Sequence, residues 1–393
     1  MSGHQPALRR VLTFWPLLFY GLGVIVGAGI YVAIGTVIAR AGDAAPVAFL
    51  IAGITAAMTG LCYAELASRF PEASGSVAYV RHGCGSQALA GLTGLLVTTT
   101  VAISAASIAR GSISYLAILL PWPPEVLLPL LIVGCTAIAA YGVGESVGIA
   151  AAIGILEIGG LIVATIAGVI AAPELHFRAM LPVDLAGWSG VMAGAFIAFF
   201  AFIGFETLAN LAEEAKDPHR TIPRGIVGAI AASIVLYVMV AIAAVLSDSG
   251  TDRPLLDIFA GAGVWLFACV GFLAVGNGTL VQVVMLARLF YGMARNGQLP
   301  ELFARVSPRT GTPLWATALA GCIVTGAAVV VSFEQLLILT NALTLAIFVL
   351  VDLALWRVQR MPASATPGFA APRWVPPVAA VLAAGLMLAD LAT

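Results

Sequence analysis

Three ionisable side chains lie deep inside long apolar stretches of this chain, where lipid would penalise an exposed charge. Glu157 stands in the middle of GILEIGG at 154–160, and Glu206 ends FFAFIGFE at 199–206. Arg110 lies about ten residues, or roughly 15 Å, from the nearer end of its stretch. A bare charge at the bilayer centre costs at least about 2.5 kcal/mol. We therefore expect all three side chains to face the protein interior, as ligands, proton carriers or ion-pair partners.

Each of the three has a chemical role and a structural alternative. Glu157 is the candidate coupling group, because a buried carboxyl group can gain and lose a proton near neutral pH; otherwise it is a neutral acid that only hydrogen-bonds a neighbouring helix. Glu206 either accepts hydrogen bonds from free backbone N–H groups, which we favour, or contacts a substrate. Arg110 is expected to pair with Glu206 or Glu157 near the outer end of its segment, with snorkelling to the surface as the alternative.

Other polar residues in the apolar segments are weaker candidates. Asn277, Thr279 and Gln282 share one long segment, where they either contact a ligand or hydrogen-bond between helices. Glu65 and Asp352 lie near the predicted inner ends of their segments, where we expect ion pairs or contact with solvent.

The sequence has no pattern typical of a catalytic, metal or cofactor site. Its five cysteines are scattered without metal-binding spacing, and its four histidines all fall in loops. Neither a nucleophile elbow nor a paired His and Asp is present. We therefore expect no enzyme activity, no catalytic residue, no metal and no cofactor. The net charge of −1 gives no indication of nucleic-acid binding.

Composition places these side chains in a polytopic membrane protein. The chain is 61% hydrophobic and 9% charged, whereas a soluble protein carries about 25% charged residues. Because a spanning helix needs about 20 apolar residues, we expect about eleven spans and no soluble domain. The expected spans are 11–39, 44–68, 87–120, 126–141, 146–172, 188–212, 224–246, 264–294, 314–332, 335–356 and 375–391.

The basic residues predict the orientation. Basic residues gather in the cytoplasmic connections of membrane proteins. If the N-terminus is cytoplasmic, the outer connections hold only Arg40, Arg178 and Arg253. The inner connections then hold Arg9, Arg10, Arg69, Arg81, Lys216, Arg220, Arg224, Arg295, Arg305, Arg309, Arg357, Arg360 and Arg373. We therefore predict a multi-pass protein of the cell membrane with a cytoplasmic N-terminus and, given eleven spans, an outer C-terminus.

The first span carries the glycine-rich stretch GVIVGAGIYVAIG at 23–35. Glycine in a helix interior costs about 1 kcal/mol relative to alanine, and irregular backbone at membrane depth is tolerated only where protein buries it or it lines a cavity. We therefore predict that the first helix breaks at Gly27, Ala28 and Gly29 and offers backbone groups to a ligand. The alternative is a helix-packing face of small residues.

Glycine and glutamate together in FFAFIGFE predict a second broken helix, in span six, with a simple glycine kink as the alternative. Spans one and six are each followed by four more, and spans three and eight are both unusually long. This order predicts an all-α fold with a five-plus-five inverted repeat and broken helices one and six. We expect a single membrane domain, 1–393, with repeat one at about 11–172, repeat two at about 187–357 and an extra helix at about 374–392.

Five motifs resemble those of a known family, the amino acid–polyamine–organocation (APC) permeases. They are the stretches at 23–35 and 199–206, YAELASRFP at 63–71, AEEAKDPHRTIPR at 212–224 and ARNGQLP at 294–300. The similarity extends from about residue 12 to 357. It implies the leucine-transporter fold, alternating access and a central amino-acid site.

The resemblance also implies roles for the two predicted breaks. The substrate carboxylate is expected on the backbone of Val26, Gly27, Ala28, Gly29 and Ile30. The α-ammonium group is expected on the carbonyls of Phe200, Ala201 and Ile203, in a stretch that continues through Gly204. Phe202 and Phe205 are expected to form a gate or side-chain pocket.

We therefore predict a secondary transporter that moves an amino acid across the cytoplasmic membrane, with protons favoured as the coupling ion. Exchange of substrate for product is the first alternative, and sodium coupling the second. A channel or a membrane-embedded enzyme is the alternative from a different class. The sequence leaves the substrate and the oligomeric state open.

Overall fold

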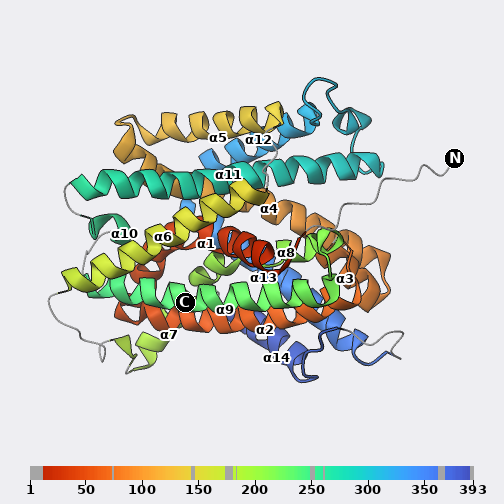
Figure 1. The fold of residues 1–393 in the computed structure, drawn as a ribbon, viewed down its shortest axis with the longest axis horizontal. Coiled ribbons are helices and arrows are strands. Elements are labelled where there is room, and N and C mark those ends of the chain that lie inside the picture. Colours follow the sequence, from red (N-terminus) through yellow and green to blue (C-terminus); the bar gives the residue numbers. More distant parts are fainter. Residues whose placement is uncertain are drawn as a thin grey trace.

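The structure, a computed structural model, is almost entirely helical (Figure 1). It describes residues 12–72, 75–142, 147–172, 180–182, 184–247, 253–259, 262–361 and 368–389. Within these ranges there is no strand, and one isolated bridge joins Leu12 to Ala215. The prediction of an all-α fold is confirmed.

Seven helical elements form the first half of the chain. They are α1 (Phe14–Ala41), η1 (Gly42–Ala44), α2 (Ala45–Arg69), α3 (Gly75–Cys84), α4 (Gln87–Leu119), α5 (Pro124–Tyr141) and α6 (Val147–Ala171). The second half begins with α7 (Leu185–Ala198), η3 (Phe199–Phe202), α8 (Thr207–Asn210), η4 (Ala212–Glu214) and α9 (Pro218–Leu246). It continues with α10 (Pro254–Asp257), α11 (Ala262–Arg295), η5 (Glu301–Ala304), α12 (Leu314–Val330), α13 (Phe333–Val358) and α14 (Val375–Ala389).

Local sequence explains where several of these helices begin. Ser86 and Asp184 cap α4 and α7, because their side-chain oxygens accept from backbone N–H groups of the first turn, at 3.3 and 2.7 Å. Ser332 and Gln335 form a reciprocal capping box at the start of α13. Proline opens α2, α5 and α9, where its missing N–H is not needed.

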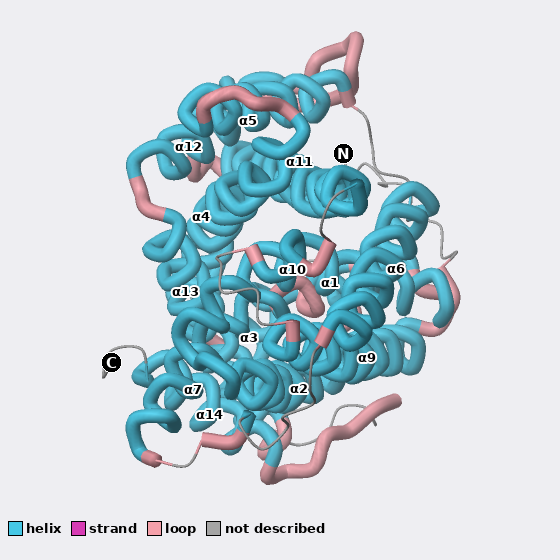
Figure 2. Tube along the Cα trace, turned by 90° about the vertical axis from the view of Figure 1, so that its left-hand side faces the viewer, coloured by secondary structure: helices cyan, strands magenta, loops and turns pink. Residues whose placement is uncertain are grey.

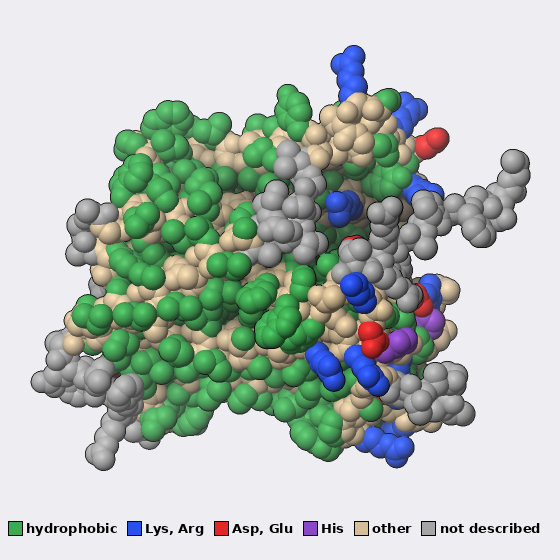
Figure 3. Space-filling model, viewed as in Figure 1, with side chains coloured by type: hydrophobic (Ala, Val, Ile, Leu, Met, Phe, Trp, Pro, Cys, Tyr) green, Lys and Arg blue, Asp and Glu red, His purple; other side chains and the backbone are tan. Residues whose placement is uncertain are grey.

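The helices are apolar enough to cross a membrane. Eight helical stretches of the described residues are long and apolar enough to span a bilayer, and the first of them contains both α1 and α2. Two shorter apolar helices, α12 and α14, fall just below that length. Each of the eleven predicted spans therefore corresponds to an apolar helix or, for span six, to an apolar stretch of several short helices. On the face shown in Figure 3, hydrophobic side chains cover the middle and basic side chains gather at one end.

Helices of the two halves pack in matching order. Helix α1 contacts its counterpart α7–η3, and in the same way α2 contacts α9, α4 contacts α11 and α5 contacts α12. A short helix follows the second long helix in each half, α3 in one and α10 in the other. Such pairing is expected of two halves related by a two-fold axis. The bounds of the two repeats stay a prediction.

The first span is one unbroken helix, so the predicted break at Gly27, Ala28 and Gly29 is wrong for this structure. The glycines allow close packing instead. A Cβ on Gly29 would lie 2.6 Å from the Cα atom of Ala201, closer than two such atoms can approach. Helix α1 lies at the centre of the molecule, against α4, α6, α7, α9 and α11 (Figure 2). Helix α1 therefore has the small-residue packing face that was the alternative prediction, and the helices it packs against belong to the same chain.

The predicted break in span six is present. Helix α7 ends at Ala198 and passes into the 3₁₀ turn η3. Ile203 is extended (ψ 135°), and Gly204 has φ 128°, a conformation that favours glycine. The chain resumes a helix only for the four residues of α8.

A glycine contact between α3 and α13 gives a test of this packing. A Cβ on Gly83 would lie 2.6 Å from the carbonyl oxygen and 2.7 Å from the Cα atom of Ala354. Backbone atoms cannot move aside, so Gly83→Ala should destabilise the protein by about 1–3 kcal/mol. The measurement is the thermal unfolding midpoint of the purified protein in detergent.

The matched control is Gly91→Ala on α4, where a Cβ would meet no atom within 4 Å. That substitution should leave the midpoint unchanged or raise it, because alanine favours a helix over glycine by up to about 1 kcal/mol. Equal midpoints for the two variants would contradict the packing of α3 on α13.

Candidate functional site

The two stretches expected to bind substrate pack directly against each other. Besides the contact of Gly29 with Ala201, a Cβ on Gly204 would lie 2.9 Å from the side chain of Val24 and 3.1 Å from its carbonyl oxygen. Of the ten predicted backbone-site residues, all are buried except Ile203, which is half-buried. Because α1 is helical here, its amide groups are engaged in the helix, and the structure has this site closed.

Side chains replace the hydrogen bonds that the break in span six removes. Glu206 Oε2 accepts from the backbone N–H of Gly204 at 2.8 Å, and Thr207 Oγ1 donates to the Gly204 carbonyl at 2.6 Å. Asn341 on α13 donates to the Phe196 carbonyl near the end of α7, at 2.7 Å. Glu206 therefore makes the backbone contact that the favoured alternative expects, and a contact of Glu206 with substrate stays a prediction. Asn341 was not predicted, because nothing in the sequence links α13 to that carbonyl.

Tyr237 on α9 ties the two site stretches together. Its buried hydroxyl lies 2.7 Å from the Ile25 carbonyl on α1 and 2.9 Å from the Ala201 carbonyl on η3, and can donate to either. Tyr237 was missed in the sequence. Its position in the middle of an apolar segment could have indicated a role, because a buried tyrosine hydroxyl normally forms a hydrogen bond.

Glu157 lies against the glycines of α1. Its side chain is buried on α6, and Oε2 lies 3.2 Å from the position that a Cβ on Gly27 would occupy. Tyr31 donates to the Glu157 backbone carbonyl at 2.9 Å, and Tyr115 donates to the Tyr31 carbonyl at 2.8 Å. The structure thus brings the coupling candidate into contact with the segment expected to hold the substrate carboxylate.

Arg110 does not pair with either glutamate, so the predicted ion pair with Glu206 or Glu157 is wrong. Its guanidinium group instead donates to the carbonyls of Ala328 and Val329, at the C-terminal end of α12. Those carbonyls lack partners inside their own helix, and a cation near a helix C-terminus is favourable. Backbone acceptors of this kind cannot be recognised from a sequence.

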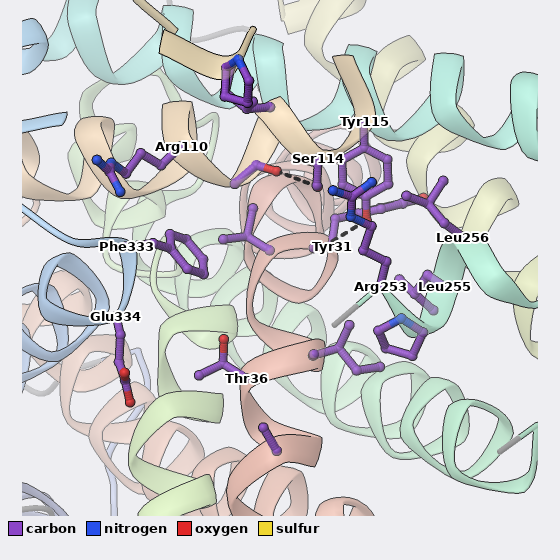
Figure 4. A pocket seen from close by; sticks show the side chains of 18 of the residues that line it. Tyr31, Thr36, Arg110, Ser114, Tyr115, Arg253, Leu255, Leu256, Phe333 and Glu334 are labelled. Carbon is purple, nitrogen blue, oxygen red and sulfur yellow. Dashed lines mark hydrogen bonds between the residues drawn. The ribbon is translucent and has the colours of Figure 1, made fainter. Parts of the chain in front are cut away.

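A cavity of about 750 Å³ begins where the α1 site segment ends. Tyr31 and Tyr115 lie at its inner limit, and its lining includes one charged side chain from each of five helices or their flanks. These are Arg40, Arg110, Glu125, Arg253 and Glu334. Figure 4 shows Arg110 and Glu334 on one side and Arg253 on the other. Arg40 and Glu334 form an ion pair between α1 and α13. This cavity was not predicted from the sequence.

The three polar candidates of α11 lie beside the site, and two of them have structural partners. Gln282 donates to Ser104 on α4 at 3.1 Å, and Thr279 donates to Val275 within its own helix. A Cβ on Gly278 would lie 2.9 Å from Cβ of Ala28, so α11 contacts the site segment of α1 there. Asn277, the neighbour of Gly278, is half-buried.

The two carboxylates predicted near the inner ends behave differently. Glu65 is buried and forms an ion pair with Arg69, with 2.6 Å between nitrogen and oxygen. Asp352 is also buried but has no ion pair among the described residues, so the expectation for it is wrong. Among the residues described, no group of three or more His, Cys, Asp or Glu side chains is arranged to hold a metal ion.

The chain is similar to amino acid transporters over most of its length. A family model described as amino acid permease matches residues 12–391. The methylthioribose transporter of Bacillus subtilis (strain 168) is 31% identical over 97% of this chain and 88% of its own length. The branched-chain amino acid permease BcaP of the same organism is 30% identical over 90% of this chain and 81% of its own length.

Plant relatives are longer than this chain. Cationic amino acid transporter 9, chloroplastic, of Arabidopsis thaliana is 31% identical over 77% of this chain, and the match covers 58% of the plant protein. For cationic amino acid transporter 4, vacuolar, the covered share of the plant protein is 65%. The chain therefore spans less than two thirds of the length of these relatives.

The hydroxyl of Tyr237 offers a test of the contact between α1 and η3. Tyr237→Phe keeps the buried ring but leaves the two carbonyls without that donor, which should cost about 1–3 kcal/mol. The thermal unfolding midpoint in detergent should fall accordingly. Tyr141→Phe is the control, because Tyr141 is 78% exposed at the end of α5 and its midpoint should not change. An unchanged midpoint for Tyr237→Phe would show that this hydroxyl does not stabilise the contact between α1 and η3.

Proposed function

Because the chain belongs to the amino acid permease family, we propose that it is a secondary transporter that carries an amino acid, or a close relative of one, across the cell membrane by alternating access. One observation supports this most directly. The two stretches expected to bind substrate meet at the centre of the protein, directly below a cavity of about 750 Å³ that ends at Tyr31 and Tyr115. A closed central site next to an open cavity is the arrangement that alternating access requires.

The orientation follows from the basic residues and stays part of the proposal. With the N-terminus in the cytoplasm, the C-terminal end of α1 and the cavity beside it face outward. The basic side chains at one end of the molecule in Figure 3 then lie at the cytoplasmic surface. On this orientation, the structure has its cavity open to the outside and its central site closed.

For the substrate, we propose a backbone site between α1 and η3. The segment Val26–Ile30 would bind the carboxylate and the segment Phe200–Gly204 the ammonium group, as the family resemblance implies. Helix α1 would have to open locally, and its glycines lower the cost of doing so, because glycine stabilises a helix least among residues other than proline. The buried neighbours Ala28, Ala201 and Phe202 favour a substrate with an apolar side chain.

For coupling, we propose that Glu157 binds and releases a proton during the cycle. Its carboxylate contacts Gly27, so a substrate carboxylate in the proposed site would lie close to it. Two nearby carboxylates repel unless one is neutral. Substrate binding would therefore favour proton uptake by Glu157, which links the two events. Exchange of one amino acid for another, which needs no titrating group, is the alternative.

A panel of two amino acids and one sugar derivative tests the function and the substrate class. The purified chain in proteoliposomes should accumulate at least one of L-leucine, L-arginine and methylthioribose, which represent the transporters named above. Uptake should saturate and show counterflow, and an inward proton gradient should drive it in the absence of sodium. Flux that rises without saturation would favour a channel, and uptake that requires sodium would exclude proton coupling.

The contact between Gly29 and Ala201 predicts which α1 substitution blocks transport. Gly29→Leu places a side chain where the η3 backbone lies, so uptake should fall to background while the protein still inserts in the membrane. Gly159→Ala on α6 is the control, since a Cβ there meets no atom within 4 Å. It should retain wild-type uptake. Normal uptake by Gly29→Leu would contradict the proposed site.

Replacing Glu157 tests the coupling. Glu157→Gln keeps the size of the side chain but cannot exchange a proton, so accumulation driven by a pH gradient should be lost. Counterflow at equal pH on both sides should persist, because it needs no net proton movement. If Glu157→Gln accumulated substrate on a pH gradient as the wild type does, the role of Glu157 in coupling would be excluded.

A further inference from the structure

A second buried carboxyl group lies outside the proposed substrate site, between α13 and α2. Asp352 is fully buried about two turns before α13 ends. Its Oδ2 atom accepts a hydrogen bond from Thr59 Oγ1 on α2 at 3.0 Å, and the Cys62 thiol is a further hydrogen-bonding neighbour. Its Oδ1 atom has no hydrogen-bond partner among the described residues. The group therefore lacks the several donors that a buried carboxylate requires.

The titratable groups that face Asp352 from α2 supply no positive charge. Cys62 and Tyr63 lie within electrostatic reach of it. Glu65, one turn further along α2, is itself acidic. The nearest cation on that helix, Arg69, is engaged by Glu65 through two contacts of 2.8 and 2.6 Å.

Of the other elements packed against α13, α3 carries Arg81 and His82, but both are exposed and contact Glu72 at 2.8 and 2.7 Å. On α13 itself, Arg357 is exposed. Tyr79 on α3 stays neutral, because burial raises the pKa of its hydroxyl. Tyr63 also lies within reach of Glu206, which is acidic. Helices α7 and α14 and the turn η3 contain no titratable residue. On α4, Arg110 and Tyr115 line the outer cavity, at the opposite end of the protein.

We propose that Asp352 is a second proton-binding site, which is protonated while α2 and α13 are packed together and releases its proton when the inner end of the protein opens. This inference rests on the proposed function. In the packed state, an ionised Asp352 would be a buried charge with no counter-ion, and such a charge is strongly disfavoured. The neutral acid carries no charge that needs a counter-ion, and the Thr59 hydroxyl and the Cys62 thiol are its polar neighbours.

Opening of the inner end changes this balance. Water that reaches the interface between α2 and α13 solvates the carboxylate, so the O–H bond of the acid breaks and the proton passes to water on the cytoplasmic side. A group that binds a proton more tightly in one conformation shifts the protein toward that conformation when protonated. Protonation of Asp352 thus favours the packed inner end, and a higher cytoplasmic pH favours its opening.

Infrared spectroscopy tests the protonation directly and requires no transport. The purified full-length protein in detergent should show the C=O stretching band of a buried carboxylic acid that Asp352→Asn lacks. Asp43→Asn is the matched control, because Asp43 is exposed and its substitution should leave the band unchanged. A wild-type protein without a band that depends on Asp352 would overturn the proposal.

Thr59→Val is a second variant that retains Asp352, and it can test the same assignment if Asp352→Asn does not fold. Removal of the hydroxyl that donates to Asp352 should leave the band in place but shift it to higher frequency, because a carbonyl that loses a hydrogen bond absorbs at higher frequency. A band that is unaffected by Thr59→Val does not belong to Asp352, and the proposal would then fail.

Transport assays connect this site to function, with the radiolabelled panel amino acid that the wild type takes up fastest as the probe. Asp352→Asn should keep counterflow at equal pH within about twofold of the wild type, whereas accumulation on an imposed pH gradient should be lost. Unchanged accumulation would overturn the role in coupling. If the wild type itself shows no accumulation on a pH gradient, the proposed proton coupling fails, while the infrared band still decides whether Asp352 holds a proton.

Discussion

Backbone polar groups at membrane depth must find partners inside the protein, and the interrupted sixth span is organised by this constraint. Where helical hydrogen bonds end, side chains of Glu206, Thr207 and Asn341 take over, and Tyr237 reaches a carbonyl on each side of the interface. These donors and acceptors come from α9 and α13 as well as from the break itself. The positions of α9 and α13 therefore depend in part on hydrogen bonds to a few backbone groups that have no partner within a helix.

Most of the fold could be predicted from the sequence, because length and hydropathy determine which segments can span a bilayer. The break in span six was also predictable, since a glycine close to a carboxylate at membrane depth is unfavourable in an uninterrupted helix that faces lipid. The glycines of α1 were misjudged because a glycine that permits close packing and a glycine that ends a helix are the same residue in a sequence. Only the position of Ala201 against Gly29 distinguishes the two.

The candidate site was predicted less completely than the fold. The two site stretches were identified, and Glu157 proved to contact one of them, but the partners of Arg110 and the hydroxyl of Tyr237 were not foreseen. In each of these cases one partner is a backbone carbonyl, which every residue carries and no sequence marks. Carboxyl groups in apolar segments are different. Because burial of a charge is unfavourable, each of them can be recognised in the sequence as a residue that needs an explanation.

The direct contact of two backbones at Gly29 and Ala201 has a consequence for affinity. No room exists for a ligand between them, so a molecule that binds there must first separate α1 from η3 or wait until thermal motion does so. The apparent dissociation constant then equals the intrinsic one divided by the fraction of molecules in the separated state. A substitution that loosens this contact without blocking the site would raise that fraction and lower the apparent dissociation constant, so the native packing limits how tightly a ligand can bind.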